Sequence, residues 1–199
     1  MDATTLADVK ASHRLASTDA TSDALIGDII TQVSGLFESY LARGLQSAAR
    51  NEYFNPDYFT RMVHVSSYPV AASPAPQVWN DMDRAWGSNT LIDPTLYTFD
   101  PDTGAFYFDR TGLVGGYRYL KISYTGGMAA DTASLKTTYP EIAYAARMQV
   151  CYEFRRRDSY ATQAIALGGG NFTVDGPVKL LDKIKDTLDR YKRIFQVMP

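Results

Sequence analysis

The chain has few of the residues from which small catalytic and metal sites are built. Its 199 residues include one cysteine, Cys151, and two histidines, His13 and His64. A single cysteine excludes an intramolecular disulfide, and no metal-type spacing joins these three side chains. No serine stands in a Gly-x-Ser-x-Gly elbow, the turn that exposes the nucleophile of many hydrolases. We therefore expect no catalytic residue, no metal and no cofactor, and we do not expect an enzyme.

The chain also lacks an excess of charge of either sign, and it lacks long hydrophobic runs. The 20 basic and 22 acidic side chains give a net charge of −2, which provides no overall attraction to nucleic acid or to an anionic membrane. No run approaches the roughly 18 apolar residues that a transmembrane helix needs. Residues 1–8 are polar and acidic, without the charged-then-apolar layout of a secretory signal. We expect no membrane partner and a protein that is made and used in a cytoplasm.

Hydrophobic residues are plentiful, and their periods divide the chain into three segments. They make up 45% of the residues, enough for a sizeable core, and tyrosine is unusually frequent with 14 residues. Tyrosine combines an apolar ring with a polar tip, which suits strands and subunit interfaces. The periods are helical over residues 5–44, strand-like over residues 48–127 and helical again from residue 138.

The first segment predicts two helices. Thr5 and Asp8 have capping-box spacing at the start of a short helix. A long amphipathic helix follows Asp23 and is expected to stop at Gly44. Its apolar stripe consists of Leu25, Ile26, Ile29, Ile30, Val33, Leu36, Phe37, Tyr40 and Leu41. Such a stripe indicates core packing rather than a cofactor site.

The second segment alternates aromatic and β-branched residues between short proline and glycine interruptions. This pattern predicts one small antiparallel sheet of about four to six strands. The expected strands are residues 59–68, 78–82, 96–99, 105–109 and 117–124. The stretch from Asp100 to Gly104 has the composition of a hairpin turn and lacks the later ligands of a calcium loop.

The third segment predicts two helices joined by a glycine-rich loop. Thr138 and Glu141 form a capping box, and Pro140 fits the first turn of a helix that runs through Arg157. The loop covers residues 159–176, and a last helix follows Pro177.

This third segment also supplies the candidate interface residues. They are Arg155, Arg156, Arg157, Gly168, Gly169 and Gly170. The three arginines close their helix, where they either stabilise its C-terminus or contact an acidic partner or DNA phosphates. The three glycines lack the Gly-Lys-Ser/Thr ending of a phosphate loop and indicate a flexible loop that could order against a partner.

We expect the α+β fold class, with a mainly α-helical core and an inserted small antiparallel β-sheet. The core is assigned to residues 1–47 plus 128–199, and the inserted β-rich subdomain to residues 48–127. Within the insertion, Tyr53, Trp79 and Trp86 would either fill the core of the sheet or form a sugar-stacking face. The second possibility keeps an alternative function open, a carbohydrate- or receptor-binding β module of a phage or bacterial surface protein.

Several short segments stand in a particular order along the chain. They include TLADVK at residues 5–10, DALI at 23–26, the stretch 97–109, LKISYTGG at 120–127, YPEIA at 139–143 and CYEFRRR at 151–157. In this order they resemble the head–tail connector (adaptor) proteins of tailed bacteriophages. The triple arginine, and the glycine loop with its long last helix, depart from the pattern of that family.

The resemblance implies a structural virion protein with no catalytic residue. Connectors of this family assemble as a ring, usually twelve-fold, under the portal protein at the capsid vertex. The ring extends the DNA channel and forms a docking platform for the next neck or tail-completion protein. The implied partners are other copies of the chain, the portal protein, that next protein and the DNA in the channel. The implied location is the capsid–tail junction, after assembly in the cytoplasm of a host bacterium.

Overall fold

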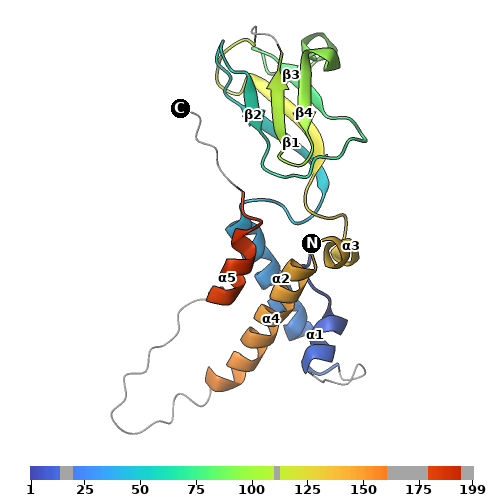
Figure 1. The fold of residues 1–199 in the computed structure, drawn as a ribbon, viewed down its shortest axis with the longest axis vertical. Helices are drawn as coiled ribbons and strands as arrows, with labels where there is room; N and C mark the ends of the chain where they lie inside the picture. Colours follow the sequence, from blue (N-terminus) through green and yellow to red (C-terminus); the bar gives the residue numbers. More distant parts are fainter. Residues whose placement is uncertain (14–19, 110–112, 161–178, 194–199) are drawn as a thin grey trace, which may run out of the picture. The chain divides into compact units, whose positions relative to one another are not determined.

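The computed structural model describes residues 1–13, 20–109, 113–160 and 179–193 (Figure 1). Residue contacts divide the chain into two compact units, residues 1–42 with 131–199 and residues 43–130. We call the first the helical unit and the second the β unit, and each is described by itself. The described residues contain α-helices and two small antiparallel sheets, so the predicted α+β fold class is confirmed.

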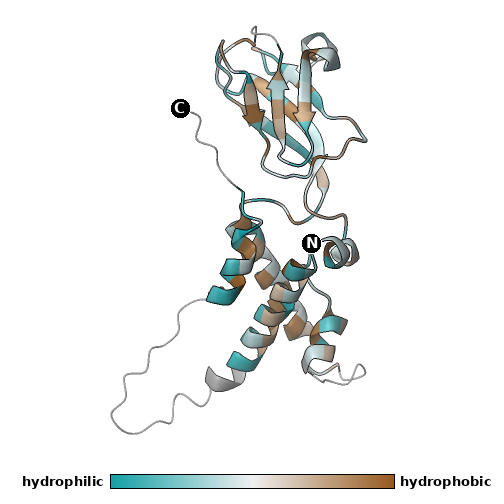
Figure 2. Ribbon diagram, in the orientation of Figure 1, coloured by the Kyte–Doolittle hydropathy of each residue, from teal (hydrophilic) through white to brown (hydrophobic). Residues whose placement is uncertain are grey.

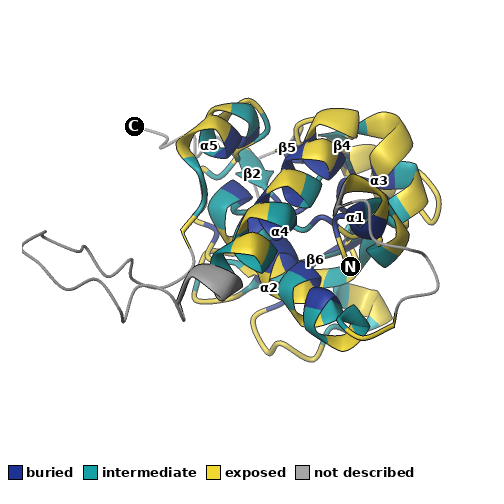
Figure 3. Cartoon of the chain, turned by 90° about the horizontal axis from the view of Figure 1, so that it is seen from below, coloured by how far each residue is buried: buried dark blue, intermediate teal, exposed yellow. Residues whose placement is uncertain are grey.

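The helical unit is built around two long helices. Its elements are α1 (Leu6–His13), α2 (Asp23–Leu41), α3 (Thr132–Thr138), α4 (Pro140–Tyr160) and α5 (Asp182–Asp189). Helix α2 packs against α4, and the dark blue buried positions of the two helices lie where they meet (Figure 3). On α2 the apolar residues Ile26, Ile30, Val33, Phe37 and Leu41 are buried. They recur every three or four residues, so the predicted apolar stripe of this helix is confirmed.

Local capping contacts and backbone conformations set where several of the helices begin and end. Thr5 caps α1, since its hydroxyl oxygen accepts a hydrogen bond from the Asp8 N–H at 3.1 Å, as predicted. Helix α2 ends earlier than expected, because Ala42 rather than Gly44 takes the left-handed conformation with φ 53°. The capping box at Thr138 is wrong: Thr138 is the last residue of α3, a helix that the periodicity did not reveal. Asp131 caps α3 through a 2.7 Å hydrogen bond from the Ser134 N–H.

The β unit contains two three-stranded sheets, so the expectation of one sheet is wrong. In the first sheet the order is β1 (Ala48–Phe54), β6 (Leu120–Gly126), β3 (Gln77–Asn80). In the second the order is β2 (Met62–His64), β5 (Ala105–Phe108), β4 (Tyr97–Asp100). All the strand pairs of these two sheets are antiparallel. Strand β1 was missed because none of its residues is fully buried, so its sequence lacks a clear apolar alternation.

The two sheets pack face to face around one aromatic-rich core. The first sheet contributes Val78, Leu120, Ile122 and Tyr124, and the second contributes Tyr97, Phe106 and Phe108. The rings of Phe99 and Phe106 stack with their centroids 5.5 Å apart. Hydrophobic residues, brown in Figure 2, recur along these strands. Because the inner faces of the two sheets are buried against each other, their outer faces point in opposite directions.

Candidate interaction surfaces

The basic end of α4 contains three of the six predicted interface residues. The prediction that these arginines close the helix is wrong, because α4 continues to Tyr160. Arg155 is exposed, while the guanidinium of Arg156 lies 3.9 Å from the Glu153 carboxylate. The side chain of Arg157 lies outside the described residues, as do Gly168, Gly169 and Gly170. The interface role of all six residues therefore stays a prediction.

A stripe of exposed apolar side chains runs along α4 before these arginines. Tyr144, Met148 and Tyr152 are 52%, 43% and 38% exposed and stand four residues apart, so they share one helix face. The guanidinium of Arg147 lies 5.2 Å from the ring centroid of Tyr144. Aromatic, Met and Arg side chains are enriched where proteins bind proteins. The sequence alone gives this α4 stripe no role, although the four-residue spacing of its side chains can be seen there.

A buried glutamine joins α4 to the start of α5. Gln149 is fully buried; its amide donates to the Glu153 carboxylate at 2.9 Å and to the Lys179 carbonyl at 3.0 Å. Its carbonyl oxygen accepts from the Leu181 N–H at 3.1 Å. These bonds fix how the segment before α5 lies against α4, because any other arrangement would leave buried polar atoms of Gln149 unpaired.

The outer face of the β1–β6–β3 sheet presents aromatic rings and cations together. The strand register places Tyr53, Lys121 and Trp79 side by side across the sheet. The Lys121 ammonium lies 4.5 Å from the Trp79 ring centroid and 5.8 Å from that of Trp86. The Trp86 ring lies 5.5 Å from the Tyr53 ring, which the guanidinium of Arg118 covers at 4.3 Å. We call these five residues the aromatic–cation row. None of its rings belongs to the core of the β unit, so the core-filling interpretation of Tyr53, Trp79 and Trp86 is wrong.

The loops that complete this row have an unusual backbone. Trp86 and Arg118 have φ angles of 55° and 57°, the left-handed region that residues other than glycine seldom adopt. Each is held by a side chain of the β unit. The Trp86 N–H donates to the Asp81 carboxylate, and the Arg118 N–H donates to the Asn55 side-chain oxygen, both at 2.8 Å. Trp86 and Arg118 thus keep an energetically unfavourable backbone conformation, and this conformation positions two side chains of the aromatic–cation row.

Asp81 is the buried anchor of one of these loops. Its carboxylate also accepts hydrogen bonds from the Asp83 N–H at 2.9 Å and the Thr90 hydroxyl at 3.3 Å. Burial raises the pKa of Asp81, but the N–H groups of Trp86 and Asp83 outweigh it and lower the pKa below its ordinary value. The charged carboxylate therefore shapes the loop and is not available as a proton acceptor.

A second polar cluster ties residues 66 and 67 to the β1–β6–β3 sheet. The Glu52 carboxylate accepts from the Ser66 N–H at 2.9 and 3.0 Å and from the hydroxyls of Ser66 and Tyr124. The Tyr124 oxygen in turn accepts from the Ser67 N–H at 3.1 Å. Burial and the neighbouring Glu52 raise the pKa of Tyr124 to about 12, so its hydroxyl stays protonated.

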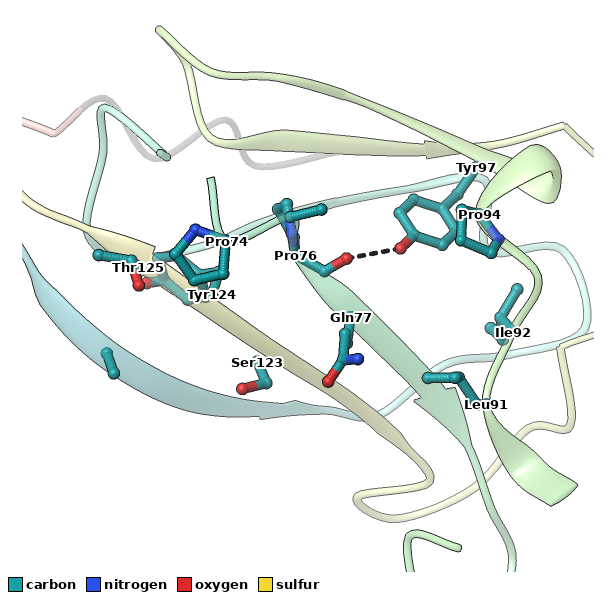
Figure 4. Close-up of a pocket in the computed structure, with 12 residues that line it drawn as sticks. Pro74, Pro76, Gln77, Leu91, Ile92, Pro94, Tyr97, Ser123, Tyr124 and Thr125 are labelled. Carbon is teal, nitrogen blue, oxygen red and sulfur yellow. Dashed lines mark hydrogen bonds between the residues drawn. The ribbon is translucent and has the colours of Figure 1, made fainter. Parts of the chain in front are cut away.

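A hollow of about 450 Å³ opens at the edge of the same sheet (Figure 4). Its lining is mainly apolar and includes Pro74, Pro94, Leu91 and Ile92, with Gln77 and Ser123 of the sheet beside them. The Tyr97 hydroxyl donates to the Pro76 carbonyl at 2.7 Å, the dashed bond in Figure 4. Among the described residues, no carboxylate, histidine, lysine or arginine lines the hollow, so these residues offer shape and apolar contact rather than acid–base chemistry.

The outer face of the β2–β5–β4 sheet has a different character. Tyr107 and Leu96 are 44% and 41% exposed there, and Asp109 is exposed beside them. The predicted hairpin turn joins β4 to β5, and its Asp100 carboxylate accepts from the Asp102 N–H at 3.0 Å and the Thr103 hydroxyl at 2.7 Å. These bonds confirm the predicted turn. They occupy the Asp100 carboxylate, which a calcium loop would need as a ligand.

In the part of the chain that the structure describes, no group of three or more His, Cys, Asp or Glu side chains is placed to hold a metal ion. Among the same residues, no helix is long and apolar enough to cross a membrane.

Comparison with known proteins gives a shared fold and no family. No family model matches the chain, and no curated protein matches it. Its α+β fold, however, is similar over nearly the whole length to chains in solved particle structures. A chain from the neck of an empty gene transfer agent (GTA) particle, computed with C6 symmetry, has a TM-score of 0.64 and 15% identity, covering 98% of this chain and 91% of that chain.

Two related structures give the same result. A chain from the virion of the native GTA particle has a TM-score of 0.60 and 15% identity. A chain from the neck of the native GTA particle, computed with C12 symmetry, has a TM-score of 0.56 and 14% identity. Both cover 98% of this chain and 91% of the other chain. At such identities the similarity establishes the fold.

Proposed function

We propose that the protein is a structural component of the neck of a phage-like particle. More specifically, it is a head–tail connector (adaptor) that forms a ring under the portal, extends the DNA channel and carries the next neck or tail protein. The proposal rests mainly on one observation: the fold similarity to the chain of the empty GTA neck covers 98% of this chain and 91% of that one. Both units are therefore shared, rather than a single common motif.

The surfaces of the chain suit a ring subunit. Head-to-tail contacts close a ring only if each copy has two different, complementary surfaces. The helical unit has the exposed α4 stripe, and the β unit has two outer faces of different composition. In this proposal the helical unit is the connector core, the β unit is inserted into it, and no residue has a catalytic role.

The triple arginine gives the proposal a specific test. Replacing Arg155, Arg156 and Arg157 together with alanine should weaken assembly, and the loss should grow as salt is lowered, because phosphates or acidic partner groups are screened by salt. The matched control replaces the exposed Lys179, Lys183 and Lys192 with alanine, which removes the same charge elsewhere. If both variants assemble equally well at every salt concentration, the arginines have no interface role and only stabilise their helix.

The proposed function itself is tested by making particles without this chain. We expect heads that package DNA but carry no tails, and tail attachment that returns when the purified chain is added. Particles with a normal neck and tail in its absence would overturn the proposal.

A carbohydrate- or receptor-binding role has one observation in its favour, the position of Tyr53, Trp79 and Trp86 outside the core. The cations of Arg118 and Lys121 already lie over these rings, so a sugar would compete with them for a ring face. Glycan-array binding that disappears in Trp86→Ala, while the fold is retained, would support this second function. Absence of binding by the unmodified chain would remove it.

A further inference from the structure

The two outer faces of the β unit carry opposite charge. On the β1–β6–β3 sheet, the strand positions facing outward are Ala49, Asn51, Tyr53, Gln77, Trp79, Lys121, Ser123 and Thr125. They include a cation and no acid, and Arg118 adds a second cation above Tyr53. On the outer side of the β2–β5–β4 sheet, the half-buried or exposed positions are Met62, His64, Leu96, Thr98, Asp100, Tyr107 and Asp109, while Ala105 on that side is buried. They include two acids and neither lysine nor arginine.

Both faces also expose apolar side chains. Tyr53 lies beside Lys121 on the cationic face, while Tyr107 and Leu96 lie beside Asp109 on the acidic face. Exposed apolar groups surrounded by charges mark surfaces that bind other proteins. The hollow beside Gln77 and Ser123 adds an apolar recess to the cationic face, of a kind that an exposed Leu96 or Tyr107 from a neighbour would fill (Figure 4).

Arg118 is prepared to bind a carboxylate. Its guanidinium is stacked on the Tyr53 ring at 4.3 Å, and among the described residues it donates to no acceptor. A stacked guanidinium keeps its N–H edge open, and that edge matches a carboxylate in two parallel hydrogen bonds. The left-handed backbone at Arg118, held by Asn55, fixes this position before any partner arrives.

We propose that the outer face of the β1–β6–β3 sheet in one copy packs against the outer face of the β2–β5–β4 sheet in the next copy. This inference rests on the proposed ring. Because the two faces point in opposite directions on one β unit, each copy offers a cationic face to one neighbour and an acidic face to the other. Such a contact is heterologous, the type that closes a ring when the rotation between copies allows it. A second copy is the occupant because the complementary charge is found on the chain itself.

The experiment is a charge exchange in the full-length chain, with self-association measured by sedimentation velocity over a series of concentrations. Arg118→Glu or Asp109→Arg alone places like charges opposite each other, and each should weaken association roughly tenfold or more. The double variant restores opposite charges across the contact and should recover most of the association. Lys183→Glu and Asp186→Arg on α5 are the matched controls, since they make the same changes at exposed positions of the helical unit.

The results separate this inference from the proposed function. Three results would each overturn the inference. The first is that the single variants associate like the unmodified chain, and the second is that the double variant recovers no association although its thermal unfolding is normal. The third is that the unmodified chain is monomeric at every concentration. The same variants are then added to tailless particles. Tail attachment that survives Arg118→Glu together with unchanged association overturns the inference and leaves the neck function standing. An unmodified chain that never attaches tails overturns the proposed function instead.

Discussion

The helical unit and the β unit use their carboxylates in different ways. Some carboxylates of the helical unit pair with cations from distant parts of the chain, as Asp8 does with Lys136 at 2.6 Å and Glu141 with Arg190 at 3.5 Å. Several carboxylates of the β unit instead accept hydrogen bonds inside their own turns, as Asp57 does from the Thr60 hydroxyl at 2.7 Å. Ion pairs thus help to join helices in the first unit, and hydrogen-bonded carboxylates shape several turns of the second. Salt screens the first kind of contact more than the second.

The largest expected effects come from the two cores. Phe37 on α2 and Phe106 on β5 are both completely buried, so replacing either with alanine should destabilise its own unit by about 3–5 kcal/mol. Since each unit has its own core, calorimetry should show Phe37→Ala lowering one transition and Phe106→Ala lowering the other. A single transition that both variants shift equally would show that the units do not unfold independently.

The next effect concerns the Tyr124 hydroxyl of the β unit. Tyr124→Phe leaves the Ser67 N–H without its acceptor and should cost about 1–3 kcal/mol in urea unfolding. The folded pKa of Tyr124, about 12, lies above the ordinary value of 10.0, so its contribution is complete below pH 10 and is lost as the pH rises toward 12. Tyr124→Phe should remove this alkaline loss. Tyr107→Phe, at an exposed tyrosine, is the control and should retain it.

The smallest effect is expected at an ion pair of the helical unit. Lys136→Ala removes the cation that pairs with Asp8, and because the lysine is exposed the cost should be only about 0.2–1 kcal/mol, less at high salt. The hydrogen bond from Lys136 lowers the pKa of Asp8 below its ordinary value of 3.8. The contribution is therefore present above that value and is lost as the pH falls through the lowered pKa. Lys183→Ala, at an exposed lysine of α5, should show neither effect.

The sequence predicted the elements that bury a regular stripe. The apolar spacing on α2, the composition of the hairpin between β4 and β5, and the cap at Thr5 all correspond to local rules, and the structure confirms them. Elements without such a stripe were missed. Strand β1 alternates half-buried and exposed residues and has no fully buried one, and α3 is a short helix defined mainly by its Asp131 cap.

The candidate surfaces were harder to predict than the fold. The aromatic–cation row joins residues from β1, β3, β6 and two loops, and only the strand register brings them together. Composition correctly marked Tyr53, Trp79 and Trp86 as notable, but it could not show that Lys121 lies beside them. The charge difference between the two outer faces likewise depends on which sheet each strand joins.

We propose that copies of this chain form a symmetric ring in a particle neck. The most direct measurement is the number of copies bound per portal-bearing, tailless head, counted by native mass spectrometry or electron cryomicroscopy of the loaded heads. We expect a fixed number of copies at the portal vertex alone, set by a rotational symmetry such as the C6 and C12 symmetries with which the GTA neck structures were computed. A chain that binds no heads, or that binds all over the capsid in variable number, would contradict this proposal.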